Sequence, residues 1–464
     1  MCVDGPDESG HYELPVTKNI LKGFSLRRLF DILYACALLI GSPWFLWRAM
    51  FRNRNRRGWA QKLFGWVPPR VSQNPCVWLH AVSVGEVNLI QPVIEGLQKR
   101  RPDLEFVIST TTETGFDLAQ QKYHDHSVFF CPFDFSWAIK RVIGRLRPDL
   151  IVLAELEVWP NLIATAQANE IPVAVVNGRL SESSFRGYRR FRWLLGSTFK
   201  NLTSVSASTQ PYADRFAQLG TPRSRIQVTG STKFDGVPMD RKNEKTRELV
   251  RLARLEPDDF VMVAGSTQPG ESLLVAKIYQ ELASEFSNLR LILVPRHPET
   301  CSSVQKVLQS SGLSVKLRSK MDSEQPSGAD VILVDVIGEL SAWWGCANAA
   351  FVGGSMGGTM GANRGGQNMI EPAAYGVPVS FGPDTRNFRE IVTQLLDADA
   401  ATAVDGEQSL TGFFRRVIAE PAWAVQMGMR ARKLVVQHSG ASDRTVDGLV
   451  ELLGPDDRER ARAA

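Results

Sequence analysis

The sequence lacks the patterns that most simply indicate a disulfide framework, a zinc site or a phosphate-binding loop. Its six cysteines are scattered and include no C-x-x-C pair, so we expect reduced thiols in a cytoplasmic setting and no zinc. The Walker and dinucleotide-binding glycine spacings are both absent. Lys and Arg total 54 against 49 for Asp and Glu, and an excess of that size does not indicate a nucleic-acid partner.

The sequence also lacks an uninterrupted apolar run of the ~20 residues that a transmembrane helix needs. The uncharged segment 32–47 is shorter and contains Pro43. Arginines flank it on both sides, and Trp44 and Trp47 lie at its downstream end, which favours the interface of an anionic membrane. We therefore predict a membrane-anchor segment at 27–59, which either lies on the membrane or spans it. A buried helix of the first domain is the alternative.

Beyond this segment, short apolar runs such as CVWLHAV and DLIVLAE alternate with amphipathic stretches. Runs that are apolar throughout are typical of parallel strands covered on both faces. A length of 464 residues indicates two domains. The predicted fold class is α/β, with two doubly wound Rossmann-like domains facing each other across a cleft. We place an extension at 1–26, the first domain at 60–232, a linker at 233–246, the second domain at 247–455 and a charged tail at 456–464.

A glycine-dense loop followed by a helix start lies between residues 351 and 378. Its many glycines leave backbone N–H groups accessible to a phosphate or a sugar. Asn368 and Glu371 come next, and a carboxylate at this place can accept both hydroxyls of a ribose. The pattern indicates a nucleotide-sugar site. An ordinary N-terminal helix cap is the alternative interpretation.

Acidic residues follow two of the predicted strands in the first domain. Glu86 lies at a strand-to-helix turn next to Gly85, where a carboxylate can act as a general base for an attacking hydroxyl. Glu155 and Glu157 end another strand, and in an extended chain they would project to the same face. One of them is expected to pair with Arg179. Each acid also has a structural interpretation, as a first-turn helix residue or as an ion-pair partner.

Cations and small-residue turns lie at corresponding places further along the chain. Lys233 lies at the domain junction, where an ammonium group can meet negative charge. Arg296 follows a strand and can clamp a phosphate, whereas the neighbouring His297 is more simply a cap or packing residue. The segment Gly338, Glu339 and Leu340 precedes a helix, where backbone N–H groups can hold a phosphate.

An ordered set of motifs runs along both predicted domains, namely HAVSVGE, TTTETG, PFDFSWAIKR, AELEVWPN, NGRLS, GSTKFD, VAGST, LVPRHPE, GEL, FVGGS and RGGQNMIEPAAYG. This set resembles the 3-deoxy-D-manno-octulosonic acid (Kdo) transferases of lipopolysaccharide synthesis. The resemblance covers roughly residues 76–391 and implies the two-domain glycosyltransferase-B fold with an N-terminal membrane-associated segment. It further implies CMP-Kdo as the donor and a lipid A precursor as the acceptor.

The resemblance also implies roles for individual residues. Glu86 would be the general base, and Glu155 and Lys233 would stabilise the transition state. At Gln367 and Met369 the chain departs from the RGGHNPLEP pattern that the family commonly has. The implied contacts to CMP fall on Pro295, Arg296, Gly338, Glu339, Leu340, Asn368, Met369, Ile370 and Glu371.

The expected reaction is an inverting transfer that requires no metal and no cofactor, because Arg296 and Lys233 can neutralise the single phosphate of a cytidine monophosphate ester. An acceptor with acyl chains stays in a bilayer, so the catalytic body is expected on the cytoplasmic face of the inner membrane. Two alternatives remain open. One is another enzyme of the same fold that uses a UDP-sugar, and the other is a non-catalytic membrane-bound scaffold.

Overall fold

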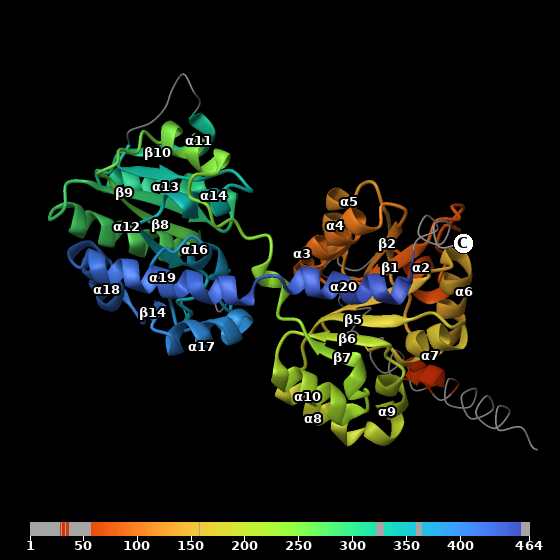
Figure 1. The fold of residues 1–464 in the computed structure, drawn as a ribbon. Helices are drawn as coiled ribbons and strands as arrows, with labels where there is room; N and C mark the ends of the chain where they lie inside the picture. The colour runs from red at the N-terminus through yellow and green to blue at the C-terminus, as the bar shows by residue number, and fades with distance from the viewer. Residues whose placement is uncertain are drawn as a thin grey trace, which may run out of the picture. The chain divides into compact units, whose positions relative to one another are not determined.

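The computed structural model describes residues 28, 30–32, 34–36, 57–156, 158–321, 329–358 and 364–455. The chain forms two compact units: unit 1 comprises Met1–Asp235 and Gly440–Ala464, and unit 2 comprises Gly236–Ser439 (Figure 1). Most of the predicted anchor, the extension at 1–26 and the tail at 456–464 lie outside the described residues. Within those residues, we find no helix with both the length and the apolar character needed to cross a membrane.

Unit 1 is built on a seven-stranded sheet in the order β3-β2-β1-β4-β5-β6-β7, in which every pairing is parallel. Successive residues of a strand face opposite sides of the sheet. Accordingly, Trp78 enters the core on one face, whereas Val77 and Leu79 enter the core on the other. The strands are β1 (Cys76–His80), β2 (Glu105–Thr110), β3 (Ser127–Phe130), β4 (Leu150–Ala154), β5 (Val173–Gly178), β6 (Ser204–Ala207) and β7 (Ile226–Val228).

Helices cover both faces of this sheet, as the apolar strands predicted. They are α2 (Trp59–Phe64), α3 (Val84–Leu89), α4 (Gln91–Arg100), α5 (Glu113–Lys122), α6 (Ser136–Leu146), α7 (Pro160–Ala168), α8 (Glu182–Arg190), α9 (Arg192–Lys200), α10 (Gln210–Leu219) and α20 (Ala441–Leu453), with 3-10 turns η1 (Arg223–Arg225) and η2 (Thr232–Phe234).

A buried carboxyl group fixes the start of α7. Asp134 accepts the backbone N–H groups of Asn161 and Leu162, each at 2.8 Å. Asp31, from the described part of the N-terminal segment, accepts the side-chain amide of the same Asn161 at 3.1 Å and the backbone N–H of Ser136 at 2.8 Å. Burial raises the pKa of Asp134 to about 7; its two backbone hydrogen bonds act against the shift, and the charge of Asp31 adds to it.

Unit 2 repeats the architecture with a second seven-stranded parallel sheet, in the order β10-β11-β9-β8-β12-β13-β14. Its strands are β8 (Phe260–Thr267), β9 (Leu289–Pro295), β10 (Val315–Leu317), β11 (Val331–Leu333), β12 (Ala349–Val352), β13 (Val379–Phe381) and β14 (Ala401–Ala403). Its helices are α11 (Glu244–Leu252), α12 (Pro269–Ala283), α13 (Cys301–Ser310), α14 (Leu340–Cys346), α16 (Ile370–Ala374), α17 (Arg389–Asp397), α18 (Glu407–Ala419) and α19 (Pro421–His438), and its 3-10 turns are η3 (Pro298–Thr300), η4 (Arg318–Lys320) and η5 (Arg386–Phe388).

The C-terminal helix α20 belongs to unit 1, whereas the sequence analysis placed residues up to 455 in the second domain. It packs on α4, and Val446 and Leu449 are buried in the core beneath β1 (Figure 1, where blue α20 lies among the orange and yellow elements of unit 1). The carboxylate of Asp235 accepts the N–H groups of Gly440 at 2.6 Å and Ser442 at 2.5 Å, which fixes the point of return. The chain therefore leaves unit 1 and re-enters it at neighbouring positions.

Candidate functional site

Glu86 lies in the first turn of α3, directly after β1. Its carboxylate accepts the backbone N–H of Val82 at 2.8 Å and the hydroxyl of Ser83 at 3.0 Å. Both partners precede the helix, so the side chain turns back over the helix start. This is the geometry of a first-turn acid, and it also holds the carboxylate in one orientation at the carboxyl end of β1.

Glu155 gathers two cations at the carboxyl end of β4. Its Oε1 lies 3.3 Å from Nζ of Lys233 and 3.6 Å from Nη1 of Arg179, which confirms the predicted pairing with that arginine. The backbone of Glu155 is left-handed (φ 56°), so the strand has already ended and Glu155 is not in the extended conformation that the sequence analysis expected. Glu157 lies outside the described residues.

Buried polar groups support the turn that carries Lys233. The side-chain oxygen of Asn177 accepts the backbone N–H of Thr232 at 3.3 Å. The amide nitrogen of Asn177 and the hydroxyl of Thr232 are buried without a hydrogen-bond partner among the described residues. Groups of this kind are costly to leave unpaired, so they mark a place where a further polar group fits. The sequence analysis included both residues in its motifs but gave them no role.

His80, the last residue of β1, is buried and neutral. Its Nδ1 lies 2.9 Å from the hydroxyl of Ser109, which also accepts the indole N–H of Trp78 at 2.8 Å. Burial lowers the pKa of His80 to about 4, so its imidazole carries no charge at neutral pH. The histidine of the HAVSVGE motif is therefore a structural group in this conformation.

Unit 2 contains a cavity of about 270 Å³ at the carboxyl ends of β8, β9 and β12. Open parallel sheets bind ligands at this edge. The structure brings together five of the predicted donor residues here, namely Arg296, Gly338, Leu340, Asn368 and Glu371. Pro295, Glu339, Met369 and Ile370 do not line the cavity. Lining residues that the sequence analysis missed are Ser266, Ser341, Trp344, Val352 and Gln367.

Glu371 and Asn368 form one side of this cavity. The side-chain amide of Asn368 donates to Glu371 at 2.9 Å, and its oxygen accepts the N–H of Ile370 at 3.0 Å. Burial raises the pKa of Glu371, and the hydrogen bond from Asn368 acts against that shift. Asn368 thus bonds to the first turn of α16 while orienting a carboxylate in the cavity, so the two interpretations of this motif are compatible.

The predicted phosphate-binding residues differ in whether their side chains already have ion-pair partners within the protein. The backbone N–H of Arg296 donates to Thr267 at 2.9 Å. The residue is exposed and lines the cavity, and its guanidinium has no carboxylate partner among the described residues. Glu339 instead makes a bidentate ion pair with Arg318 at 2.8 and 2.9 Å and lies 3.4 Å from Lys245. Its side chain is therefore directed to structural partners.

A buried glutamate holds the glycine loop. The carboxylate of Glu271 accepts the N–H groups of Gln268 and Gly354 at 2.8 and 2.7 Å, and those of Ser355 and Met356 at 3.0 Å each. At Gly353 a Cβ atom would lie 2.6 Å from the backbone of Thr267 and 2.9 Å from Glu271. Some of the glycines in this loop therefore permit close packing around Glu271 rather than around a ligand.

A local sequence signal existed for Ser266, one of the missed residues, but not for Trp344. Ser266 is left-handed (φ 54°) in the small-residue turn AGST that ends β8. A Cβ atom at the preceding Gly265 would lie 2.3 Å from the ring of Trp344. Glycine at this position lets the indole close one wall of the cavity, but that contact joins distant residues and no local pattern indicates it.

Comparison with known proteins gives matches over most of the chain. Residues 54–236 match the family model described as 3-deoxy-D-manno-octulosonic-acid transferase (kdotransferase). A 3-deoxy-D-manno-octulosonic acid transferase of Bordetella pertussis is 32% identical over 91% of this chain and 99% of its own. One from Haemophilus influenzae is 31% identical over 81% of this chain and 87% of its own.

Among solved structures, a UDP-N-acetylglucosamine 2-epimerase has the same fold. It superposes with a TM-score of 0.51 at 13% identity, covering 81% of this chain and 96% of its own. This likeness confirms the predicted architecture of two parallel-sheet α/β domains.

Proposed function

The chain belongs to the 3-deoxy-D-manno-octulosonic acid transferase family and is a glycosyltransferase of lipopolysaccharide synthesis, and from this premise we propose that it transfers Kdo from CMP-Kdo to a lipid A precursor. The observation that carries the proposal is the cavity in unit 2, where Arg296, Asn368 and Glu371 converge beyond the strand ends. A site of this kind combines a cation for phosphate with a carboxylate for sugar hydroxyls.

CMP is the part of the donor that this cavity suits. Its single phosphate requires one strong cation, and the guanidinium of Arg296 can form bidentate hydrogen bonds to that phosphate. The carboxylate of Glu371 can accept the ribose hydroxyls, since Asn368 already fixes its orientation. Gly338 and Leu340 would contribute through the backbone, because the side chain of the intervening Glu339 is paired with Arg318.

Glu86 is the proposed general base. It removes the proton from a sugar hydroxyl of the acceptor, and the oxygen forms a bond to the anomeric carbon of Kdo. The bond between that carbon and the phosphate oxygen breaks, and CMP leaves with the electron pair. The two hydrogen bonds from Val82 and Ser83 would keep the carboxylate aimed at its substrate throughout.

Glu155, Arg179 and Lys233 are proposed to stabilise the negative charge that develops on the leaving group. Both cations contact the same carboxylate, so their charges are held in a fixed geometry. Charges that are positioned before the reaction need no reorganisation when the transition state forms. Asn177 has a positioning role, since it binds the backbone beside Lys233.

We also propose that unit 1 lies against the cytoplasmic face of the inner membrane, where a lipid acceptor is held. Helices α8 and α9 support this, because Phe191 is 50% and Trp193 is 79% exposed. Exposed arginines lie near these residues in the chain, at positions 186, 189, 190 and 192. Exposed aromatic side chains among arginines suit an anionic membrane surface. The segment 27–59 is proposed to strengthen the same attachment.

The decisive experiment is a reaction with purified full-length protein. The protein is incubated with CMP-Kdo and a lipid A precursor in detergent, and the lipid product is weighed by mass spectrometry. We expect a product larger by whole Kdo residues and the release of CMP. A protein that binds CMP but forms no product would act as a scaffold, and preferential binding of UDP over CMP would indicate a UDP-sugar enzyme.

A further inference from the structure

Unit 2 has a second cavity, larger than the first and on the opposite edge of the sheet. Its volume is about 410 Å³. Phe260 begins β8, Asn348 immediately precedes β12 and Pro378 immediately precedes β13, so the cavity lies at the amino ends of these strands. The candidate donor site lies at their carboxyl ends. The two cavities are therefore separate, and the proposed reaction makes no use of this one.

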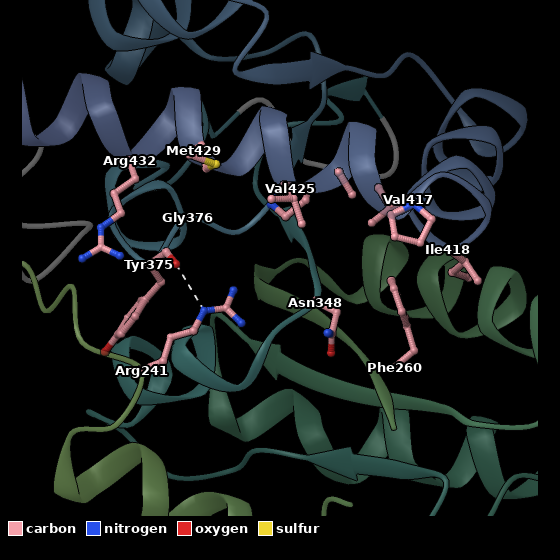
Figure 2. Close-up of a pocket in the computed structure, with 13 residues that line it drawn as sticks. Arg241, Phe260, Asn348, Tyr375, Gly376, Val417, Ile418, Val425, Met429 and Arg432 are labelled. Carbon is pink, nitrogen blue, oxygen red and sulfur yellow. Dashed lines mark hydrogen bonds between the residues drawn. The ribbon is translucent and has the colours of Figure 1, made fainter. Parts of the chain in front are cut away.

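The lining of this cavity is divided into a cationic end and an apolar end. Figure 2 shows Arg241 and Arg432 at one end, beside Tyr375, and Phe260, Val417 and Ile418 at the other. Helix α19 runs along the cavity and contributes apolar side chains that are open to solvent. Val425 is 59% exposed and Met429 is 66% exposed.

The two arginines lie close to the same turn. The Nε of Arg241 donates to the carbonyl oxygen of Tyr375 at 3.2 Å. At Gly376 a Cβ atom would lie 3.8 Å from the Cβ and Cδ of Arg432, so the stem of this arginine passes over the next residue of the turn. The turn is the C-terminal end of α16, and it brings both side chains to one end of the cavity.

Neither guanidinium has a carboxylate partner in the described part of the chain. Desolvation lowers the pKa of Arg241 from its usual value, and the positive charge of Arg432 acts in the same direction. Neighbouring thiol and phenol groups of Cys346 and Tyr375 oppose the shift only in their ionised forms. At neutral pH the cavity therefore ends in two like charges without a counterion, and a bound anion would relieve their repulsion.

We propose that this cavity binds an amphiphile with one anionic head group and a linear apolar tail. The head group, a phosphate or a carboxylate, lies between Arg241 and Arg432, which can form charge-assisted hydrogen bonds to it. The tail follows α19 over Val425 and Met429 toward Phe260 and Ile418. The distribution of charge and apolar surface selects this ligand over a free phosphate, which would leave the apolar end exposed, and over a neutral lipid, which would leave the arginines without a counterion. The inference does not depend on the proposed function.

Isothermal titration of the full-length protein with four probes tests the head group and the tail separately. The probes are decyl phosphate, decanoate, decanol and inorganic phosphate, each used below its micelle concentration and in the presence of saturating CMP. We expect one of the two charged amphiphiles, or both, to bind at least tenfold more tightly than decanol and inorganic phosphate. Which of the two binds more tightly identifies the head group. Equal binding of decanol, or no binding of either charged amphiphile, would overturn the proposal.

Variants place the bound amphiphile on the protein. The double substitution Arg241→Gln and Arg432→Gln should raise the dissociation constant about tenfold or more, since it removes two charged donors. Val425→Arg should also weaken binding by obstructing the tail. Because Val425 is exposed to solvent, this substitution should leave the fold intact. Lys433→Gln on the same helix is the control, because it removes a neighbouring charge that does not line the cavity. Binding that survives both test variants, or that CMP displaces, would put the amphiphile elsewhere and disprove the assignment.

Discussion

The candidate catalytic group of unit 1 and the candidate donor cavity of unit 2 are prepared for their ligands in different ways. In unit 1 the acids are already engaged: Glu86 accepts hydrogen bonds from Val82 and Ser83, and Glu155 is paired with Arg179 and Lys233. In unit 2 Arg296 lines the cavity and has no carboxylate partner among the described residues, and Glu371 bonds to Asn368.

This difference separates two kinds of contribution to a transfer reaction. Charges fixed by internal partners are oriented before the substrate arrives, so their loss should lower the rate more than it lowers affinity. Groups that line a cavity gain their contacts with the ligand only when it binds, so their loss should lower affinity. The following experiments compare the two units on this basis.

The largest effect is expected for Glu86→Gln. The amide retains the size of the side chain but cannot accept a proton at neutral pH, so transfer should fall about 10²–10⁴-fold while CMP affinity is unchanged. Turnover assays and CMP titrations measure the two quantities. Glu113→Gln, which changes a first-turn acid of α5, is the control for helix stability and should leave turnover near normal. Near-normal turnover of the Glu86 variant would exclude it as the base.

Lys233→Met should lower the transfer rate about 10²–10³-fold, as is typical when one preorganised group that stabilises transition-state charge is removed. The methionine retains most of the apolar stem, and Glu155 keeps its contact with Arg179. Single-turnover rates with saturating CMP-Kdo measure the effect. Lys200→Met, on the last turn of α9, should be neutral. A change in CMP affinity without a change in rate would move Lys233 from transition-state stabilisation to donor binding.

Glu371→Gln should raise the dissociation constant for CMP about 10–100-fold, because hydrogen bonds to charged groups contribute about 1.5–3 kcal/mol. Burial raises the pKa of this carboxyl, so the wild-type protein should bind CMP less tightly as the pH falls and the carboxylate is protonated. The Glu371→Gln variant should lose that pH dependence. Glu244→Gln, a first-turn acid of α11, is the matched control. Equal CMP affinity of the wild type and the Glu371 variant would mean that Glu371 does not bind CMP and serves only at the start of the helix.

The smallest effect concerns the stability of unit 1. Asp134 is also a buried acid with a raised pKa, and it bonds only to protein groups. An unfolded chain releases the proton near pH 4, whereas folded Asp134 retains it to about pH 7. The contribution of this group to stability is thus complete at low pH and is lost as the pH rises toward 7.

Between pH 5 and pH 6, the free energy of unfolding of wild type relative to Asp134→Asn should fall by about 1 kcal/mol. Urea unfolding of both proteins at the two pH values measures this difference. The unfolding transition that the substitution shifts is assigned to unit 1. A difference that is constant with pH would mean that Asp134 is ionised in the folded state throughout this range.

The strands were predictable from the sequence because both faces of each sheet are covered, which makes runs such as β1 and β4 apolar throughout. The positions of Arg296 and Glu371 at one edge were predictable for a related reason, since parallel strands deliver their following residues to the same side. Both inferences rest on local patterns and on a general rule of topology.

The features that escaped prediction depend on contacts between distant residues. The glycine loop was interpreted as a ligand cradle, but three of its own N–H groups, those of Gly354, Ser355 and Met356, bind Glu271, which lies more than eighty residues earlier in the chain. Glu155 was expected in extended chain, but its backbone is left-handed, and its carboxylate contacts Arg179 and Lys233, which come from later segments of the chain. An amphipathic pattern at residues 441–453 fits either sheet, and only its packing on α4 assigns it to unit 1.

The return of α20 to unit 1 has a consequence for synthesis of the chain on the ribosome. Val446 and Leu449 complete the core over α4, and they are among the last described residues to be made. Unit 2 is a continuous insertion whose ends meet at Asp235 and Gly440, so it can finish folding first. A nascent chain that stops before residue 440 would leave unit 1 with an uncovered apolar surface. Premature termination close to the C-terminus is therefore expected to yield an aggregation-prone product rather than a slightly shortened enzyme.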